Sequence, residues 1–224
     1  MNTGYAIAID GPSGAGKSTA AKNVARTMGL VYVDTGAMYR AIALFAIQNG
    51  MDPKNRVAVE RLLTKINIEI VPDKKGQRLI LNETDVTDLL RAQDIAEGAS
   101  LVAQYEAVRE KLTTLQREIA SKGHVVMDGR DIGSVVLPWA QVKIYLDADL
   151  KTRIARRADE LRAKGLPIDL KAIRSEIEIR DDRDTNRAFG PLTRAADAVY
   201  LDTTGLDEKE VNDKIIAIIK SKKP

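Results

Sequence analysis

Cysteine is absent from this chain of 224 residues, which excludes disulfide bonds, thiolate zinc sites and a cysteine nucleophile. Its absence fits a reducing cytoplasm, and we expect any bound metal ion to be held by oxygen ligands. No apolar run is long enough to cross a membrane, and no basic segment with an apolar stretch opens the chain as a secretory signal. We therefore expect a cytoplasmic protein with no membrane partner.

Aromatic residues and excess charge are also scarce. Aromatics make up 4% of the chain and the formal net charge is only +3. Nucleic-acid-binding surfaces usually combine a concentrated basic face with aromatic side chains that stack on bases. We therefore expect no nucleic-acid partner. The single histidine, His124, follows a glycine at the start of an expected strand, and we expect no catalytic role for it.

The residues that are present suit a globular core, because 44% are hydrophobic and 30% are charged. We expect one domain over residues 1–224, with strands alternating with helices, and hence an α/β fold with a parallel sheet covered on both faces. Thr35 is placed to cap the helix that follows the second strand. The expected core strands are residues 5–10, 30–34, a strand from 124, 142–149 and 198–205.

The middle of the chain has a different pattern. Residues 66–71 and 78–82 alternate with period two around the turn sequence PDKKGQ, which predicts an antiparallel hairpin. A polar helical stretch is expected from about Thr87 to Lys122. A second helical stretch, from Lys151 to Arg187, is crowded with arginine.

The sequence GPSGAGKS, Gly11–Ser18, matches G-x-x-x-x-G-K-[ST] between an expected strand and an expected helix. Glycines let backbone N–H groups converge on an anion, and the start of the helix adds unpaired N–H groups and a positive dipole end. Lys17 can reach β- and γ-phosphates, and the Ser18 hydroxyl can bind Mg²⁺. The loop therefore predicts a nucleoside triphosphate site.

The motif leaves the reaction open. A GTP switch would need a guanine-reading N-K-x-D segment, which is absent, and a motor ATPase usually needs a larger body. A small-molecule kinase needs a second anion site and arginines that neutralise the transferred phosphoryl group. Arginines at helical spacing fit that need, although they also fit a solvated helix with ion pairs. They are Arg153, Arg156 and Arg157, and then Arg180, Arg183 and Arg187 with Asp184 between.

Five segments, IDGPSGAGKST, DTGAMYRAIAL, DGRDIGSVV, VKIYLDAD and EIEIRDDRDTNRA, together resemble the bacterial-type cytidylate kinases of the nucleoside monophosphate kinase group. The resemblance runs in order over nearly the whole chain. It implies a P-loop kinase fold with a five-stranded parallel sheet flanked by helices. It also implies a small antiparallel insert at roughly 57–100, a helical lid at roughly 151–187, and a monomer.

The activity that the resemblance implies is ATP-dependent phosphorylation of CMP and dCMP, with Mg²⁺, in pyrimidine nucleotide metabolism. It implies catalytic roles for Lys17, Arg130, Arg180 and Arg187, and a metal ligand in Ser18. The implied ATP-binding residues are Gly11, Pro12, Ser13, Gly14, Ala15, Gly16, Lys17, Ser18, Thr19, Arg156, Arg157 and Arg183. The implied CMP-binding residues are Thr35, Tyr39, Arg40, Ser100, Arg109, Arg130, Asp131, Arg180, Asp184 and Arg187.

Within that set, Asp131 can accept from the N4 amine of cytosine, while Arg109 and Ser100 can donate to N3 and O2. Uracil has a carbonyl in place of the amine and would oppose the carboxylate with an acceptor. Two other carboxylates, Asp10 and Asp128, end core strands and are candidates either for holding metal-bound waters or for structural hydrogen bonds. Alternatives that stay open are another acceptor, such as UMP, AMP or shikimate, and an ATP-binding regulator without acceptor chemistry.

Overall fold

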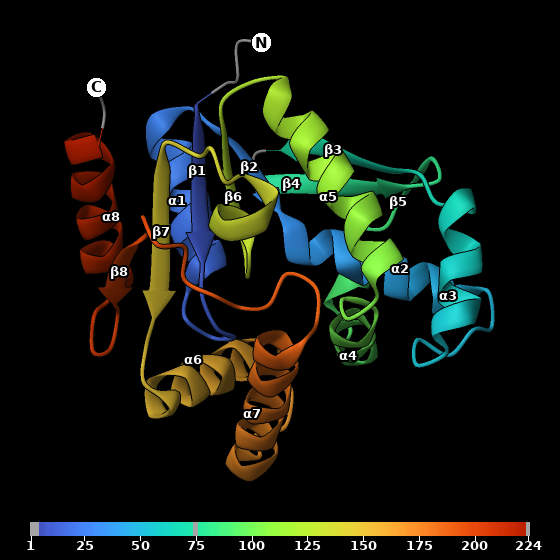
Figure 1. The fold of residues 1–224 in the computed structure, drawn as a ribbon. Helices are drawn as coiled ribbons and strands as arrows, with labels where there is room; N and C mark the ends of the chain where they lie inside the picture. The colour runs from blue at the N-terminus through green and yellow to red at the C-terminus, as the bar shows by residue number, and fades with distance from the viewer. Residues whose placement is uncertain (1–4, 74–75, 223–224) are drawn as a thin grey trace.

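The computed structural model describes residues 5–73 and 76–222. Its larger sheet contains five parallel strands, as the resemblance implies, and their order is β2-β6-β1-β7-β8 (Figure 1). All five residues of β1 and of β6 are buried, which explains their nearly continuous apolar sequences. The strands are β1 (Ala6–Asp10), β2 (Val31–Asp34), β6 (Val125–Gly129), β7 (Val142–Asp147) and β8 (Val199–Asp202).

Helices cover both faces of this sheet. On one face, α1 and α8 enclose a core that includes Ile7, Ile9 and Ile215. On the other, α2 and α5 pack over Ala6 and Ala8, because successive side chains of a strand point to opposite faces. The four helices are α1 (Lys17–Met28), α2 (Thr35–Gln48), α5 (Glu106–Ser121) and α8 (Glu208–Lys222).

The predicted hairpin is present and belongs to a small antiparallel sheet in the order β3-β4-β5. Positions 74 and 75 of its expected turn lie outside the described residues. The side chain of Gln77 joins this sheet to β2, because its Oε1 accepts from the Asp34 backbone N–H at 2.8 Å. The elements here are α3 (Arg56–Leu62), a 3₁₀ turn (Leu63–Lys65), β3 (Ile68–Asp73), β4 (Gly76–Leu81) and β5 (Thr84–Asp85).

The helical stretch expected from about Thr87 to Lys122 is not a single helix. It contains a 3₁₀ turn (Leu89–Arg91), then α4 (Gln93–Val102), and then α5 after a break. Tertiary contacts hold the break. The Tyr105 hydroxyl donates to the Pro53 carbonyl at 2.8 Å, and Arg109 donates to the Ala103 carbonyl at the end of α4 at 3.3 Å.

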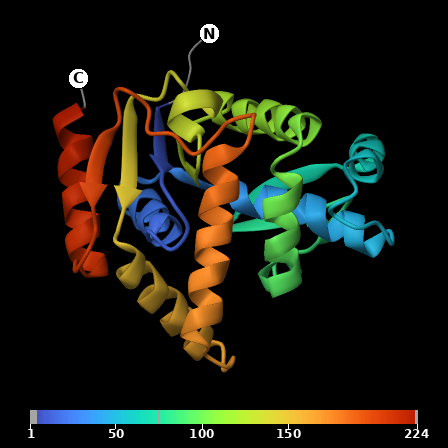
Figure 2. The same cartoon turned by 60° about the horizontal axis from the view of Figure 1, so that its bottom comes forward.

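The expected helical stretch from Lys151 to Arg187 is likewise two helices, α6 (Leu150–Ala163) and α7 (Leu170–Asn186). Gly165, at φ 69°, and the nearby Pro167 account for the break. The two helices share a small core of Ala158, Ile173 and Ile177. Figure 2 shows α7, in orange, between α1, in blue, and α4, in green.

A short π-type turn (Ile132–Val136) follows β6 and completes the set of elements. Among residues 5–73 and 76–222, no helix has both the length and the apolar character that a membrane crossing requires.

Candidate active site

One cleft of about 1580 Å³ lies at the carboxyl ends of the parallel strands, between the glycine-rich loop, α2, α4 and the α6–α7 pair. Typical single-ligand pockets measure about 300–1,000 Å³, so this cleft has room for two nucleotides. It is lined by every site residue named from the sequence except Asp10, Gly11, Pro12, Arg153 and Arg183. Sequence segments far apart in the chain are therefore brought to one place.

The glycine-rich loop (Gly11–Ser18) has the backbone that its sequence predicts. Gly11, Gly14 and Gly16 have φ values of 148°, 76° and 87°. A Cβ on Gly11 would collide with the backbone carbonyl of Leu146, so only glycine fits there. Helix α1 begins directly after Gly16 without a side-chain cap, which leaves its first N–H groups free for an anion.

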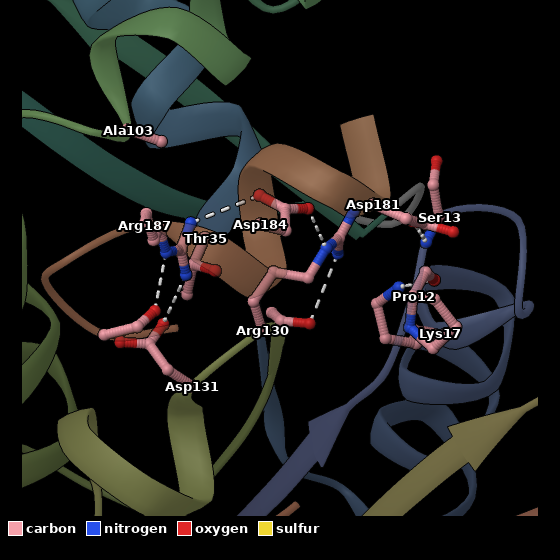
Figure 3. A network of polar contacts seen from close by, with 12 residues as sticks. Pro12, Ser13, Lys17, Thr35, Ala103, Arg130, Asp131, Asp181, Asp184 and Arg187 are labelled. Atoms are coloured by element: carbon pink, nitrogen blue, oxygen red, sulfur yellow. Dashed lines mark hydrogen bonds and ion pairs between the residues drawn. The ribbon is translucent and has the colours of Figure 1, made fainter. Parts of the chain in front are cut away.

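Lys17, the first residue of α1, is buried and points back over the loop, where its Nζ donates to the Pro12 carbonyl at 2.6 Å (Figure 3). Burial, together with the nearby Arg130 guanidinium, lowers the pKa of Lys17 well below its ordinary value. Few negative charges lie near the Lys17 ammonium, so phosphate oxygens bound beside it would stabilise its charged form.

Ser18 and Tyr32 both bind the carboxylate of Asp128. The Ser18 hydroxyl donates to Oδ2 at 2.7 Å and the Tyr32 hydroxyl donates to Oδ1 at 2.9 Å. Burial, followed by the charge of Asp34, raises the pKa of Asp128 to about 6. In contrast, Asp10 accepts from the backbone N–H groups of Ile132 and Gly133 at 2.8 and 2.7 Å, so its carboxylate holds the loop after β6.

A hydroxyl beside a carboxylate is a donor set that suits Mg²⁺. The part of the chain that the structure describes contains no group of three or more Asp, Glu or His side chains placed to hold a metal ion. Ser18 and Asp128 therefore fit a Mg²⁺ that takes its remaining ligands from phosphates and water, as in nucleotide sites generally.

Thr35 does not cap α2, contrary to the sequence-based expectation. Asp34 is the N-cap residue, and its Oδ1 accepts from the Ala37 N–H at 2.9 Å. The Thr35 hydroxyl instead donates to the Asp128 carbonyl at 2.7 Å and so joins α2 to β6. Asp34 also pairs with Arg40 at 2.9 Å, which places that guanidinium at the edge of the cleft.

On the far side of the cleft, two carboxylates hold a group of arginines (Figure 3). Asp184 accepts from Arg130 at 2.7 Å and from Arg187 at 3.2 Å. Burial alone would raise the pKa of Asp184, but the neighbouring guanidiniums, Arg130 first, lower it below its ordinary value. Asp131 forms an ion pair with Arg109 and faces Arg187 at 3.5 Å.

Several donors on this side of the cleft have no acceptor. Arg180 has no hydrogen-bond or ion-pair partner among the described residues, although burial lowers its pKa only to about 10 and it stays charged at neutral pH. The buried Ser100 hydroxyl and one nitrogen each of Arg40 and Arg187 also lack hydrogen-bond partners. The guanidiniums of Arg40, Arg109, Arg130, Arg180 and Arg187 line the cleft together with carboxylates that include Asp131 and Asp184.

Guanidiniums with free N–H donors suit a phosphate monoester, which carries a charge approaching −2 at neutral pH. The free donors therefore indicate a second anion site, separate from the glycine-rich loop.

The lid arginines differ in position. Arg156 is fixed beside the glycine-rich loop, donating to the carbonyls of Ala15 and Thr203 at 3.3 and 2.8 Å. Arg157 pairs with Glu160 at 3.0 Å and Glu176 at 3.1 Å. The structure does not bring Arg183 into the cleft, and its role in ATP binding stays a prediction.

Four residues of the site were missed from sequence alone: Asp34, Tyr32, Gln77 and Gly190. Gly190 has φ 56°, its carbonyl accepts from Arg187 at 2.6 Å, and a Cβ there would collide with Asp131 and Arg109. The Gly-Pro pair in AFGP was the available signal, because this dipeptide marks a turn. Asp34 also had a local signal, because an aspartate between a strand and a helix is a good N-cap residue. Tyr32 and Gln77 have no local signal, since their roles come from contacts with distant residues.

A five-stranded parallel sheet with a glycine-rich loop opening α1, and a group of arginines across the cleft, defines the fold of a P-loop kinase. The family model described as cytidylate kinase matches residues 7–221, and the chain belongs to the cytidylate kinase family.

Similar proteins agree with this placement. A cytidylate kinase of Pediococcus pentosaceus is 46% identical over 221 residues, covering 99% of this chain and 98% of the relative. A cytidylate kinase of Carboxydothermus hydrogenoformans is 46% identical over 213 residues, covering 95% and 96%.

Solved structures share the fold at low identity. An uncharacterised protein from Eubacterium ventriosum has a TM-score of 0.53 at 15% identity, covering 97% of this chain and 98% of its own. TT1252 from Thermus thermophilus has a TM-score of 0.51 at 16% identity and full coverage of both chains, 100% each.

Proposed function

We propose that the protein transfers the γ-phosphoryl group of ATP directly to the phosphate of CMP or dCMP, giving ADP and CDP or dCDP. The observation that carries this proposal is the pairing of two anion sites in one cleft. One is the start of α1 with Lys17, and the other is the arginine group that includes the unpartnered Arg180. The membership of the cytidylate kinase family supports the same reaction.

In the proposed reaction, an oxygen of the CMP phosphate forms a bond to the γ-phosphorus. The bond from that phosphorus to the β–γ bridging oxygen breaks, and its electron pair leaves with ADP. No side chain needs to act as a nucleophile, because the protein aligns the two phosphates and stabilises their charge. Lys17, Arg130, Arg180 and Arg187 supply that positive charge.

Asp131, Arg109 and Ser100 are the proposed readers of cytosine. All three are buried and line the cleft, and the Ser100 hydroxyl has no hydrogen-bond partner among the residues that the structure describes. Asp184 is proposed to bind the ribose, since each of its oxygens keeps a lone pair after accepting from one arginine. Tyr39 and Arg40, in the first two turns of α2, and Thr35 complete the proposed CMP site.

Ser18, and Asp128 through water, are the residues that would hold Mg²⁺, which when bound neutralises charge on the β- and γ-phosphate oxygens. Gly14, Ala15, Gly16 and Thr19 would bind the ATP phosphates with backbone N–H groups. Gly11, Pro12 and Ser13 would bind ATP by shaping the loop, because Pro12 has no N–H and the Ser13 N–H is bound by Asp181. Closing of α6 and α7 over the cleft would exclude water and so prevent hydrolysis of ATP.

An acceptor panel tests the proposal. ADP release is measured with purified enzyme, ATP and Mg²⁺ against CMP, dCMP, UMP, AMP and shikimate in turn, with a blank that lacks acceptor. We expect kcat/KM to be highest for CMP or dCMP. Faster turnover of UMP or AMP would reject the assignment of cytosine recognition, and turnover independent of any acceptor would reject the kinase itself.

We expect Tyr32→Phe to shift the acid limb of the pH–rate profile upward by about one unit. The Tyr32 hydroxyl stabilises the ionised form of Asp128, so its loss raises a pKa that is already about 6, and Asp128 then protonates at higher pH. The substrate phosphate also titrates near pH 6, but equally for both enzymes, so the difference between the two profiles isolates Asp128.

Tyr145→Phe is the matched control, because Tyr145 lies on β7 outside the cleft. Superimposable profiles for Tyr32→Phe and wild type would remove Tyr32 from the site.

We also propose that the enzyme acts as a monomer in the cytoplasm, where its nucleotide substrates are found. Light scattering after size-exclusion chromatography tests the oligomeric state, and a mass near twice 24.6 kDa would contradict it.

A further inference from the structure

A polar contact outside the cleft joins α7 to the glycine-rich loop. Asp181 Oδ1 accepts from the backbone N–H of Ser13 at 3.0 Å (Figure 3), and its Oδ2 pairs with Arg153. Arg153 also donates to the Ser13 carbonyl at 3.0 Å. The three residues thus close a ring in which both polar groups of the Ser13 backbone are bound.

The three residues of the ring are closely packed against their neighbours. The side chains of Arg153 and Asp181 are only 12% and 20% exposed, so water screens their ion pair weakly. Arg153 is further fixed by donating to the Ala148 carbonyl at 3.1 Å, directly before α6. The first turn of α6 also presses on the loop, because a Cβ on Gly14 would lie 3.1 Å from the Arg153 Cβ. The ring therefore fixes the loop to the first turn of α6 and to the last two turns of α7, whereas the opposite ends of the two helices lie outside the ring.

Neither Arg153 nor Asp181 lines the cleft, so neither is placed to touch a substrate. Asp181 is nevertheless the immediate neighbour of Arg180, and Asp184 follows one turn later on the same helix. Successive helix residues are about 100° apart, so α7 presents Arg180 and Asp184 to the cleft while Asp181 holds the loop. Helix α7 therefore contacts the glycine-rich loop, where ATP is proposed to bind, and also carries Arg180 and Asp184, which are proposed to bind CMP.

We propose that Asp181 and Arg153 are positioning residues, which fix α7 on the glycine-rich loop so that Arg180 and Asp184 face the phosphoryl group held there. This inference rests on the proposed function. Alignment of the reacting groups is the main task in phosphoryl transfer, and misplacing a group by about 1 Å can cost about 100-fold in rate.

Asp181→Asn is the sharpest test, since it keeps the size and one acceptor oxygen but removes the charge that Arg153 pairs with. We expect kcat to fall between about 10- and 100-fold and KM for CMP to rise, with KM for ATP within about threefold of wild type. Asp182→Asn is the matched control, because Asp182 is an exposed carboxylate on the same helix that accepts from Asn186 and makes no contact with the loop. The control should keep wild-type kinetics.

Arg153→Gln and the double variant complete a cycle. If the two residues act as one unit, the double variant loses no more activity than either single variant; independent, multiplying losses would overturn the proposal. Equal kinetics for Asp181→Asn and Asp182→Asn would also overturn it. The proposal would also be overturned if the activity fell only because a smaller fraction of the protein is active, with KM for CMP unchanged. That pattern indicates a merely structural role.

Amide hydrogen exchange gives a readout that needs no substrate. We expect faster exchange in Asp181→Asn than in Asp182→Asn at the Ser13 amide and along α7. Unchanged exchange would show that the ring does not hold the helix. A wild-type enzyme that fails to phosphorylate CMP would instead reject the proposed function, and the exchange result would still decide whether the ring exists.

Discussion

Lys17→Ala is expected to lower kcat by about 1,000-fold and to leave the fold intact. Phosphoryl transfer depends on cations that stabilise charge on the moving group, and single preorganised donors or cations of this kind are worth about 10²–10⁵ in rate. Lys17 contributes little to stability, because it is a buried ammonium whose pKa is lowered by burial and which donates, within the described part of the chain, to the Pro12 carbonyl alone. The measurements are kcat with ATP and CMP, and the thermal midpoint.

Arg26→Ala is a suitable control, because it removes an exposed cation from the same helix α1. It should behave as wild type in both measurements. Unchanged turnover in Lys17→Ala would refute the phosphate role of Lys17, and with it the donor site that the glycine-rich loop predicts.

Asp131→Asn is expected to lower the ratio of kcat/KM for CMP to that for UMP by about 100-fold. The Asp131 carboxylate is the proposed acceptor for the cytosine amine, whereas an amide can donate to the carbonyl that uracil carries at that position. A mismatched buried hydrogen bond costs about 1–3 kcal/mol. In the wild type this penalty falls on UMP, and in Asp131→Asn it falls on CMP, so the ratio changes by both penalties together. Both ratios come from the same ADP-release assay.

Asparagine is preferred to alanine here because Asp131 also faces the buried guanidiniums of Arg109 and Arg187. Removing one partner of such a group costs about 3–5 kcal/mol in stability, so a loss of activity in Asp131→Ala would mix unfolding with specificity. Asp88→Asn, at the mouth of the same cleft, is the control for an exposed carboxylate. Equal losses for CMP and UMP in Asp131→Asn would exclude Asp131 from base reading.

The parts of the fold that the sequence predicts are those with a local cause. Period-two alternation identifies the β3–β4 hairpin, and the fixed spacing of glycines with Lys17 identifies the loop that opens α1. The sequence also predicts a cluster of arginines, because their helical spacing on α6 and α7 can be counted directly.

The parts that the sequence does not predict depend on distant contacts. Residues 103–105 contain no glycine or proline, and the break between α4 and α5 there is held by Tyr105 and Arg109. Thr35 and Asp34 are both good capping residues. Asp34 caps the helix because the Thr35 hydroxyl donates instead to the Asp128 carbonyl. Asp181 and Asp182 are identical in sequence terms, and only the fold shows that one binds the loop while the other faces solvent.

The strand order has a consequence for how the chain is made. Strand β6 lies between β1 and β2, and Ala6 pairs with Val125, so the centre of the sheet closes only after more than half of the chain has been synthesised. Contacts so distant in sequence slow folding, and until they form the apolar strands β1 and β2 have no partner. Protease resistance of ribosome-bound chains should therefore first arise once Val125–Gly129 has left the exit tunnel, and earlier resistance of the N-terminal segment would contradict this order.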